Sequence, residues 1–280
     1  MTDRYAVIGN PIKQSMSPDI HGAFARETAQ DMEYGKLFAE VDGFKPVVDK
    51  FFADGGKGLN ITAPFKLDAF DYADSLSERA RTAGAVNTLA LQNDGTLLGD
   101  NTDGPGLVSD IVNNLGWKIA GQKVLVLGAG GATRGTLLPL LKQQPAQLHI
   151  ANRTAHKAQQ LAEDFSGYGA ITASGLDAVP EGFDLVINAS AASLSGELPP
   201  LSPRALAEGC CAYDMVYGAQ PTPFMRWAAE LGAEVSDGLG MLVGQAAESF
   251  ALWRGVRPQV APVLTMLRDR LRAQAASEKE

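Results

Sequence analysis

The sequence has few cysteines, no long apolar run and no excess of positive charge. Its only two cysteines, Cys210 and Cys211, are adjacent, and adjacent cysteines rarely bridge, so we expect reduced core residues of a cytoplasmic protein. No stretch of about 18 uncharged apolar residues is present, which excludes an ordinary transmembrane helix. The N-terminus has no basic segment followed by an apolar one, so no signal peptide is expected. A net charge of −8 argues against a nucleic-acid or anionic-membrane surface.

Glycine is the one residue type in excess, and it favours tight turns and close backbone approaches. It fills 30 of the 280 positions, as in α/β proteins built around ligands. The length predicts two domains or one large one. His21, His149 and His156 have no mutual spacing typical of a metal site, so we expect no metal.

Strand and helix patterns alternate through the first hundred residues. Strands are expected at 5–8, 34–41 and 59–62, and helices from Pro18 with Ser17 as N-cap, at 43–53 and at 66–73. A glycine-rich turn is expected at 55–58. Asp94-Gly95 between two apolar runs predicts a hairpin. We therefore expect an N-terminal α/β domain over residues 1–103.

The second half has the pattern of a doubly wound parallel sheet. Residues 123–127 form a short, continuously apolar run, as expected of a strand buried on both faces. A helix is expected over 103–115, and the further expected elements are helices at 132–141 and 155–165 and strands at 147–151, 185–188 and 212–215. The sheet domain should span 104–240, followed by two C-terminal helices within 241–280.

A glycine loop follows the buried strand and opens the next helix. Gly128 permits a tight turn, and Gly130 lets the backbone approach a pyrophosphate at the helix N-terminus. The third position of the dinucleotide fingerprint is Thr133 rather than glycine, so the strict pattern is broken. The loop nevertheless predicts a nucleotide site.

The residues at the end of the next strand indicate which nucleotide the site binds. An NAD site normally has an acidic residue there for the ribose 2′-hydroxyl, whereas this chain has Asn152, Arg153 and Thr154, with Lys157 one turn later. A neutral amide and two cations suit a 2′-phosphate. The site is therefore predicted to select NADP.

Polar residues at strand ends of the first half predict a substrate site. Ser15 and Ser17 can aim two hydroxyls at one anion beside a helix N-terminus. Lys66 begins a helix, where a cation is unfavourable, and lysine is a plausible general acid or base. Asn87 is an amide inside an apolar strand, and Asp103 belongs to a polar group at the junction of the two halves.

Eight motifs along the chain resemble, in order, those of the shikimate dehydrogenase family. They are GNPI (9–12) with SxSP (15–18), NITxPxK (60–66), GAVNT (84–88), NTDG (101–104), GAGGA (128–132), NRT (152–154), YDMVY (213–217) and DGLGMLVxQAA (237–247). Two positions depart from the family pattern: Gln14 stands where histidine is usual, and Ser193 stands where glycine is usual.

The resemblance implies an N-terminal domain that binds substrate and a Rossmann-like domain that binds NADP, with the active site in the cleft between them. The C-terminal helices would pack back on the N-terminal domain. The implied reaction is reversible reduction of 3-dehydroshikimate to shikimate by hydride transfer at C3, a step of chorismate and aromatic amino acid biosynthesis. Lys66 and Asp103 would form the catalytic pair, with Lys66 passing the proton.

The resemblance also implies the remaining site residues. The substrate set is Ser15, Ser17, Asn60, Thr62, Lys66, Asn87, Asp103, Tyr217 and Gln245, in which Ser15, Ser17 and Tyr217 hold the carboxylate. The cofactor set is Gly128, Ala129, Gly130, Gly131, Ala132, Asn152, Arg153, Thr154, Lys157, Met215 and Gly238, in which Met215 and Gly238 line the nicotinamide end.

Two other functions compete with this interpretation. One is an enzyme of the same fold that acts on quinate with NAD, which the basic residues after the second strand disfavour. The other is a catalytically silent, NADP-binding regulator. Such a protein would be expected to lose the acid/base pair, yet Lys66 and Asp103 are both present. The expected partner is a small-molecule substrate, with no nucleic acid or membrane, and the chain is expected to be a monomer or a homodimer.

Overall fold

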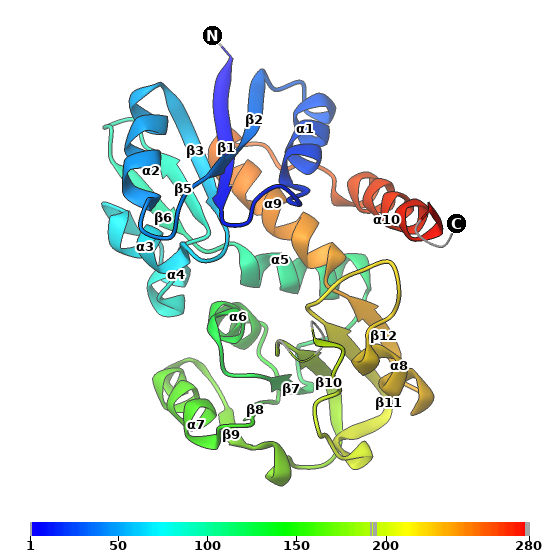
Figure 1. Ribbon diagram of the computed structural model, residues 1–280. Helices are drawn as coiled ribbons and strands as arrows, with labels where there is room; N and C mark the ends of the chain where they lie inside the picture. Colours follow the sequence, from blue (N-terminus) through cyan, green and yellow to red (C-terminus); the bar gives the residue numbers. More distant parts are fainter. Residues whose placement is uncertain (1, 191, 193–194, 278–280) are drawn as a thin grey trace. The chain divides into compact units, whose positions relative to one another are not determined.

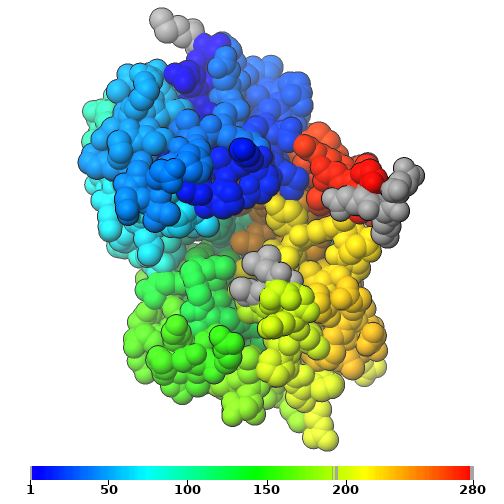
Figure 2. Space-filling view, viewed as in Figure 1, coloured from blue at the N-terminus to red at the C-terminus, as the bar shows by residue number. Residues whose placement is uncertain are grey.

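The computed structural model describes residues 2–190, 192 and 195–277, so Ser193 and the last three residues lie outside the described part. The chain forms two compact units, one of Met1–Gly106 with Val243–Val263 and one of Leu107–Leu242 with Leu264–Glu280. Figure 1 traces the elements of each unit, and Figure 2 gives the same view in space-filling form with the same colours along the chain. Within the described residues, no helix is both long and apolar enough to cross a membrane.

The first unit is built on a mixed sheet of six strands in the order β2-β1-β3-β5-β6-β4. The strands are β1 (Asp3–Gly9), β2 (Met32–Phe38), β3 (Gly56–Ile61), β4 (Ser75–Leu76), β5 (Thr88–Leu91) and β6 (Leu97–Asp100). The helices that begin in this unit are α1 (Ser17–Glu27), α2 (Phe44–Ala53), α3 (Lys66–Tyr72), α4 (Glu78–Ala83) and α5 (Asp103–Ser109). β1 runs parallel to β2 and β3, and β5 and β6 form the predicted antiparallel hairpin.

Side chains on the two faces of this sheet form separate cores. Ala6 and Ile8 of β1 pack into an apolar cluster with residues of α2 and α3. Tyr5, the alternate residue, lies against Trp253 at a ring separation of 4.7 Å on the opposite face. The glycines expected as a turn at 55–58 are instead mostly strand. A Cβ on Gly58 would lie 2.4 Å from the Trp253 indole nitrogen, so this strand needs glycine where Trp253 covers it.

The second unit is the predicted doubly wound sheet. Its strands are β7 (Lys123–Leu127), β8 (Gln147–Asn152), β9 (Ile171–Gly175), β10 (Phe183–Asn188), β11 (Leu206–Asp214) and β12 (Glu234–Asp237). All pairs are parallel, in the order β12-β11-β10-β7-β8-β9. The strand order reverses between β7 and β10, and ligands of such sheets bind at that point, outside the carboxyl ends of the strands.

Helices cover both faces of the second sheet, so its central strand is apolar throughout. The helices are α6 (Gly131–Lys142), α7 (Ala155–Asp164) and α8 (Pro223–Glu230). Val124 and Val126 pack on one face, Leu125 and Leu127 on the other, and all four are fully buried. The strand buried on both faces that the continuous apolar run predicts is therefore confirmed.

Three helices extend beyond a single unit. The helix predicted over 103–115 is α-helical as α5 and continues as a π-helical segment, Asp110–Asn114. The C-terminal helices are α9 (Leu239–Arg254) and α10 (Val260–Ser277). The unit boundaries fall within all three helices, at Gly106/Leu107 in α5, Leu242/Val243 in α9 and Val263/Leu264 in α10.

Candidate active site

Lys66 and Asp103 form an ion pair in the first unit. Each is the first residue of its helix, α3 and α5, and Lys66 Nζ lies 2.5 Å from Asp103 Oδ2. The two side chains keep 36% and 16% of their surface exposed, so a small molecule can reach them. An ammonium beside a carboxylate can pass a proton to a neighbouring oxygen while keeping its orientation.

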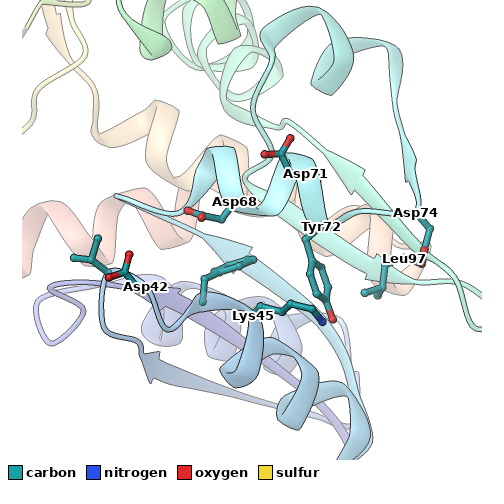
Figure 3. Close-up of a pocket in the computed structure, with 9 residues that line it drawn as sticks. Asp42, Lys45, Asp68, Asp71, Tyr72, Asp74 and Leu97 are labelled. Atoms are coloured by element: carbon teal, nitrogen blue, oxygen red, sulfur yellow. The ribbon is translucent and has the colours of Figure 1, made fainter.

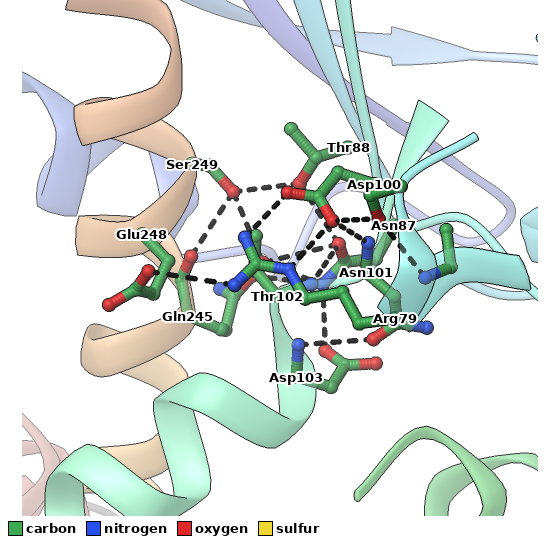
Figure 4. Close-up of polar contacts among 12 residues, drawn as sticks. Arg79, Asn87, Thr88, Asp100, Asn101, Thr102, Asp103, Gln245, Glu248 and Ser249 are labelled. Carbon is green, nitrogen blue, oxygen red and sulfur yellow. Dashed lines mark hydrogen bonds and ion pairs between the residues drawn. The ribbon is translucent and has the colours of Figure 1, made fainter. Parts of the chain in front are cut away.

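Asn87 holds the Asp103 carboxylate from the other side. Its amide nitrogen donates to Asp103 Oδ1 at 2.8 Å, and its carbonyl oxygen accepts the backbone N–H of Thr102 at 2.9 Å. Figure 4 shows these contacts converging where β5 begins and β6 ends. Asn87 is not inside a strand as expected but directly precedes β5, and it is buried, so its amide needs the partners that it finds here.

Helix α9 adds two polar side chains to the same cluster. Gln245 Oε1 lies 3.5 Å from the Asn87 amide nitrogen. Ser249 Oγ lies 2.8 Å from the Thr88 hydroxyl and 3.2 Å from the Thr102 hydroxyl. Hydrogen bonds thus join residues of β5, α5 and α9 that are far apart in the sequence (Figure 4).

Asn60 belongs to this cluster, but its amide is engaged within the protein. The Tyr34 hydroxyl donates to Asn60 Oδ1 at 2.7 Å. Asn60 Nδ2 donates to Ser249 Oγ at 2.9 Å and to Thr88 Oγ1 at 3.1 Å. Sequence reasoning missed Tyr34, Thr88 and Ser249, because single hydroxyl groups at unrelated positions give no spacing signal.

Ser15 and Ser17 form a separate pair. Ser15 Oγ lies 3.2 Å from Ser17 Oγ and also accepts the Ser17 backbone N–H at 3.3 Å. The expectation that Ser17 caps α1 is wrong: the helix begins at Ser17, and its N-cap residue is Met16. Thr62, which directly follows β3, is half-buried and shows no bond to either group of side chains among the described contacts.

The glycine loop of the second unit borders a cavity of about 600 Å³ at the point where the strand order reverses. Gly128 has φ +112°, and a Cβ there would lie 3.2 Å from the backbone of Ala189 and Ser190 after β10. The N-terminus of α6 has no side-chain cap, and a Cβ on Gly130 or Gly131 would meet open space. Uncapped N–H groups beside open space can bind an anion such as a pyrophosphate.

Thr133 explains the departure from the strict glycine fingerprint. It is fully buried, and its hydroxyl donates to the Gly128 carbonyl at 3.0 Å. The threonine therefore fastens the helix to the loop, at the position where a third glycine would allow close helix–strand packing. The Thr133 hydrogen bond therefore stabilises the glycine loop although the third glycine of the fingerprint is missing.

The cavity contains part of the predicted cofactor set. Its predicted members are Gly128, Ala129, Gly130, Gly131, Ala132, Asn152 and Arg153; Thr154, Lys157, Met215 and Gly238 are not among its lining residues. Arg153 is exposed, and the Asn152 amide donates to the Thr154 carbonyl at 3.0 Å. The lining also includes Glu197.

Met215 and Gly238 lie against one another in the second unit. A Cβ on Gly238 would lie 2.1 Å from the Met215 carbonyl oxygen, so only glycine fits there. The preceding Asp237 accepts two hydrogen bonds from Arg268 of α10, at 2.7 and 2.5 Å. Tyr217, 37% exposed, belongs to this unit, whereas the other predicted substrate residues belong to the first.

A second cavity, of about 700 Å³, shares no residue with either predicted set. Figure 3 shows Asp42, Asp68, Asp71 and Asp74 around it, with Lys45 beside Tyr72. Lys45 forms an ion pair with Asp49 at 2.9 Å, so this lysine is already neutralised. Across the described ranges, no group of three or more His, Cys, Asp or Glu side chains could hold a metal ion.

Comparison with known proteins identifies the family. The shikimate dehydrogenase substrate binding domain matches residues 7–89, shikimate/quinate 5-dehydrogenase matches 108–195, and the shikimate 5′-dehydrogenase C-terminal domain matches 238–267. A shikimate dehydrogenase (NADP(+)) from Janthinobacterium sp. (strain Marseille) is 60% identical over 270 residues, which cover 96% of this chain and 98% of that protein.

Two solved structures have the same fold. An Ael1 enzyme from Pseudomonas putida superposes with a TM-score of 0.92 at 48% identity, covering 95% of this chain and 98% of that one. Shikimate 5-dehydrogenase from Thermus thermophilus, solved in complex with NADP(H) and shikimate, has a TM-score of 0.85 at 31% identity, covering 96% and 99%. With relatives this similar along almost its whole length, the chain belongs to the shikimate dehydrogenase family.

Proposed function

We propose that this chain is an NADP-dependent oxidoreductase that reversibly reduces 3-dehydroshikimate to shikimate. The observation that carries the proposal is the accessible Lys66–Asp103 pair, held by Asn87 in a chain of the shikimate dehydrogenase family. We assign the substrate and the chemistry to residues 1–103 and NADP to residues 104–240. The free cysteines Cys210 and Cys211 support a reducing, cytoplasmic location.

Reduction of the ketone places a hydride on C3 and a proton on its oxygen. Negative charge grows on that oxygen as the hydride arrives, and the Lys66 ammonium can neutralise it and donate the proton. Asp103 keeps the ammonium in place through its 2.5 Å contact. In the reverse direction Lys66 takes the proton from the C3 hydroxyl.

The remaining polar side chains recognise the rest of the substrate. Ser15 and Ser17 suit a carboxylate, since their two oxygens lie together at the N-terminus of α1. The ring hydroxyls are assigned to Thr62, Asn87 and Gln245 beside the catalytic pair. Tyr217 is assigned to the carboxylate with Ser15 and Ser17, and Asn60 is the remaining member of the proposed set.

The cavity of the second unit suits NADP. The uncapped N-terminus of α6 would bind the pyrophosphate, and Arg153, with Asn152 beside it in the lining, would bind the 2′-phosphate. Thr154 and Lys157 complete this side, and Met215 and Gly238 the nicotinamide end. When bound, the cofactor supplies or accepts the hydride.

A steady-state comparison of four substrate–cofactor pairs tests the proposal. Shikimate and quinate are each oxidised with NADP and with NAD, and formation of the reduced nicotinamide is followed by its absorbance. We expect the highest kcat/KM for shikimate with NADP. A preference for quinate with NAD would favour the other dehydrogenase. NADP binding with no turnover of either acid would favour the regulator. Size-exclusion chromatography distinguishes a monomer from a homodimer.

A further inference from the structure

Asp100 is a buried carboxylate that the proposed chemistry does not use. It ends β6, three residues before Asp103, and its side chain is only 4% exposed. It accepts four hydrogen bonds: from Ser77 Oγ at 2.5 Å, from Arg79 Nε at 2.7 Å, from Arg79 Nη2 at 2.5 Å and from the Asn101 N–H at 2.8 Å. Figure 4 shows Arg79 reaching this carboxylate across the polar cluster.

Arg79 is what allows Asp100 to stay ionised. Burial by itself would raise the pKa of Asp100, but the two bonds and the charge of Arg79, together with Ser77 and the Asn101 amide, hold that pKa below its usual range. Without the guanidinium, a buried negative charge would be left uncompensated, and its removal from water is costly. The carboxylate would then have to move toward water or take up a proton.

Movement of Asp100 would be transmitted to Asp103 through the turn between them. The Asn101 N–H is bonded to Asp100, and the Asn101 side-chain oxygen accepts the Asp103 backbone N–H at 3.2 Å. The Asn101 amide nitrogen donates to the Ala85 carbonyl at 3.1 Å. Asp100 therefore fixes the peptide of Asn101, and Asn101 fixes the start of α5.

We propose that Arg79 is a positioning residue of the reaction, which acts through Asp100 and Asn101 to hold Asp103 against Lys66. The inference rests on the proposed function, because it concerns the geometry of the same acid/base pair. A further contact supports it: Arg79 Nη1 lies 3.9 Å from Glu248 of α9, the helix that also carries Gln245 and Ser249. The guanidinium therefore links the start of α4 to two other elements of the cluster.

The test compares three arginine variants in two backgrounds. Arg79→Gln removes the charge, Arg79→Lys keeps a charge but loses the two-point fork, and Arg81→Gln is the control. Arg81 lies on the same helix, is exposed, and donates to the Leu76 carbonyl. Each variant is made alone and with Asp103→Asn. The melting temperature of each is determined, and kcat and KM are measured below the temperature at which any of them begins to unfold.

Arg79→Gln should lower kcat by about 10- to 100-fold, because small displacements of a catalytic group cost this much. The KM for NADP should stay within about twofold, since only one domain is changed, and Arg79→Lys should recover part of kcat. In the Asp103→Asn background, Arg79→Gln should change kcat by less than about threefold, because residues that act as a unit are not additive. Arg81→Gln should match the wild type.

Three results would overturn the inference. One is a lowered melting temperature with kcat unchanged in Arg79→Gln, which would mean a purely structural role. The second is an equal kcat loss from Arg79→Gln with and without Asp103. If Arg79→Gln does not fold, Arg79→Lys decides instead, and the third result is a wild-type kcat in that variant. Asp103→Asn alone separates the proposed function from this inference. An unchanged kcat in Asp103→Asn would overturn the proposed Lys66–Asp103 pair itself. A lower kcat in Asp103→Asn together with an unchanged kcat in Arg79→Gln would overturn only the role of Arg79.

Discussion

Asn87 donates to Asp103 Oδ1 at 2.8 Å, while Lys66 binds the opposite oxygen, Oδ2. The carboxylate is therefore held on both sides, by a buried neutral amide and by an accessible cation. The hydrogen bond from the Asn87 amide to Oδ1 fixes the direction in which Oδ2 points, and with it the position of the Lys66 ammonium. The roles of Lys66 and Asp103 can therefore be tested by substituting each residue separately.

Replacing Lys66 by alanine should reduce catalysis far more than binding. Its ammonium is needed most where charge builds on the C3 oxygen, so kcat should fall by about 10²–10⁴-fold, the usual range for a general acid or base. Shikimate binding, measured by calorimetry, should weaken much less. Asp103→Asn should weaken both, because Asp103 is also proposed to bond a ring hydroxyl, and the double variant should lose less than the sum.

Lys45→Ala is the matched control, because Lys45 is an exposed lysine of the same unit that pairs with Asp49. It should leave kcat unchanged. A kcat for Lys66→Ala within about threefold of the wild type, at saturating substrate and cofactor, would remove Lys66 from the mechanism.

Arg153→Ala should weaken NADP and spare NAD. A charge-assisted bond to the 2′-phosphate is worth roughly 1.5–3 kcal/mol, or about 10- to 150-fold in affinity. The KM for NADP should rise accordingly, whereas the KM for NAD should barely change. Arg204→Ala, an exposed arginine of the same unit that pairs with Glu181, is the control. Equal weakening of both cofactors would show that Arg153 is structural.

The sequence was most informative where burial imposes a pattern. The strand around Val124–Leu127 is apolar at every position because helices cover both faces of its sheet, and this pattern predicted the doubly wound fold. The hairpin followed from Asp94-Gly95. Lys66 and Asp103 are 37 residues apart, and it was the resemblance, rather than any spacing, that paired them.

The supporting contacts could not be predicted from the sequence in the same way. Ser249 meets Thr88 across 161 positions, and neither residue belongs to a periodic pattern. Helix α4, which carries Arg79, has only six residues and only alanines for its buried side, too little to reveal a helical period. Such contacts depend on the tertiary fold, which local propensity does not describe.

Ser15→Ala should affect binding of the substrate's carboxylate rather than the chemical step. The carboxylate is distant from C3, so the lost bond is the same in the ground and transition states, and KM should rise more than kcat falls. Shikimate methyl ester is the chemical control: the wild type should discriminate against it, and Ser15→Ala should lose part of that discrimination. A loss of kcat alone, with KM unchanged, would contradict the assignment.

Gly106→Ala should destabilise the first unit. A Cβ there would lie 2.5 Å from the backbone nitrogen of Gln245, and backbone cannot move aside as a flexible side chain can. Overpacking of this kind costs about 1–3 kcal/mol of unfolding free energy. Gly35→Ala is the control, because a Cβ at that strand position meets nothing within 4 Å. Urea unfolding of the two variants should differ; equal stabilities would mean that α5 and α9 do not approach as closely as described.

His21 should make the stability of the protein depend on pH. It is fully buried and stacked on Tyr34 at 4.2 Å, and the Asn60 side chain lies beside its ring. Burial lowers its pKa to about 3, from the ordinary 6.5 that it regains on unfolding. Between these values the unfolded chain binds a proton that the folded chain does not, so the free energy of unfolding falls as the pH falls below 6.5.

His21→Phe keeps an aromatic ring against Tyr34 and removes the titrating group. Between pH 6.5 and pH 5 the wild type should lose about 2 kcal/mol relative to this variant, since each pH unit below the unfolded pKa costs about 1.4 kcal/mol. At neutral pH the two proteins should have similar stability, because the variant removes the cost of burying the polar imidazole but also its interaction with Asn60. Urea unfolding of both proteins at pH 7, 6 and 5 gives the difference directly. Parallel pH dependences would mean that His21 is solvated or bonded in the folded protein and does not carry this part of its acid sensitivity.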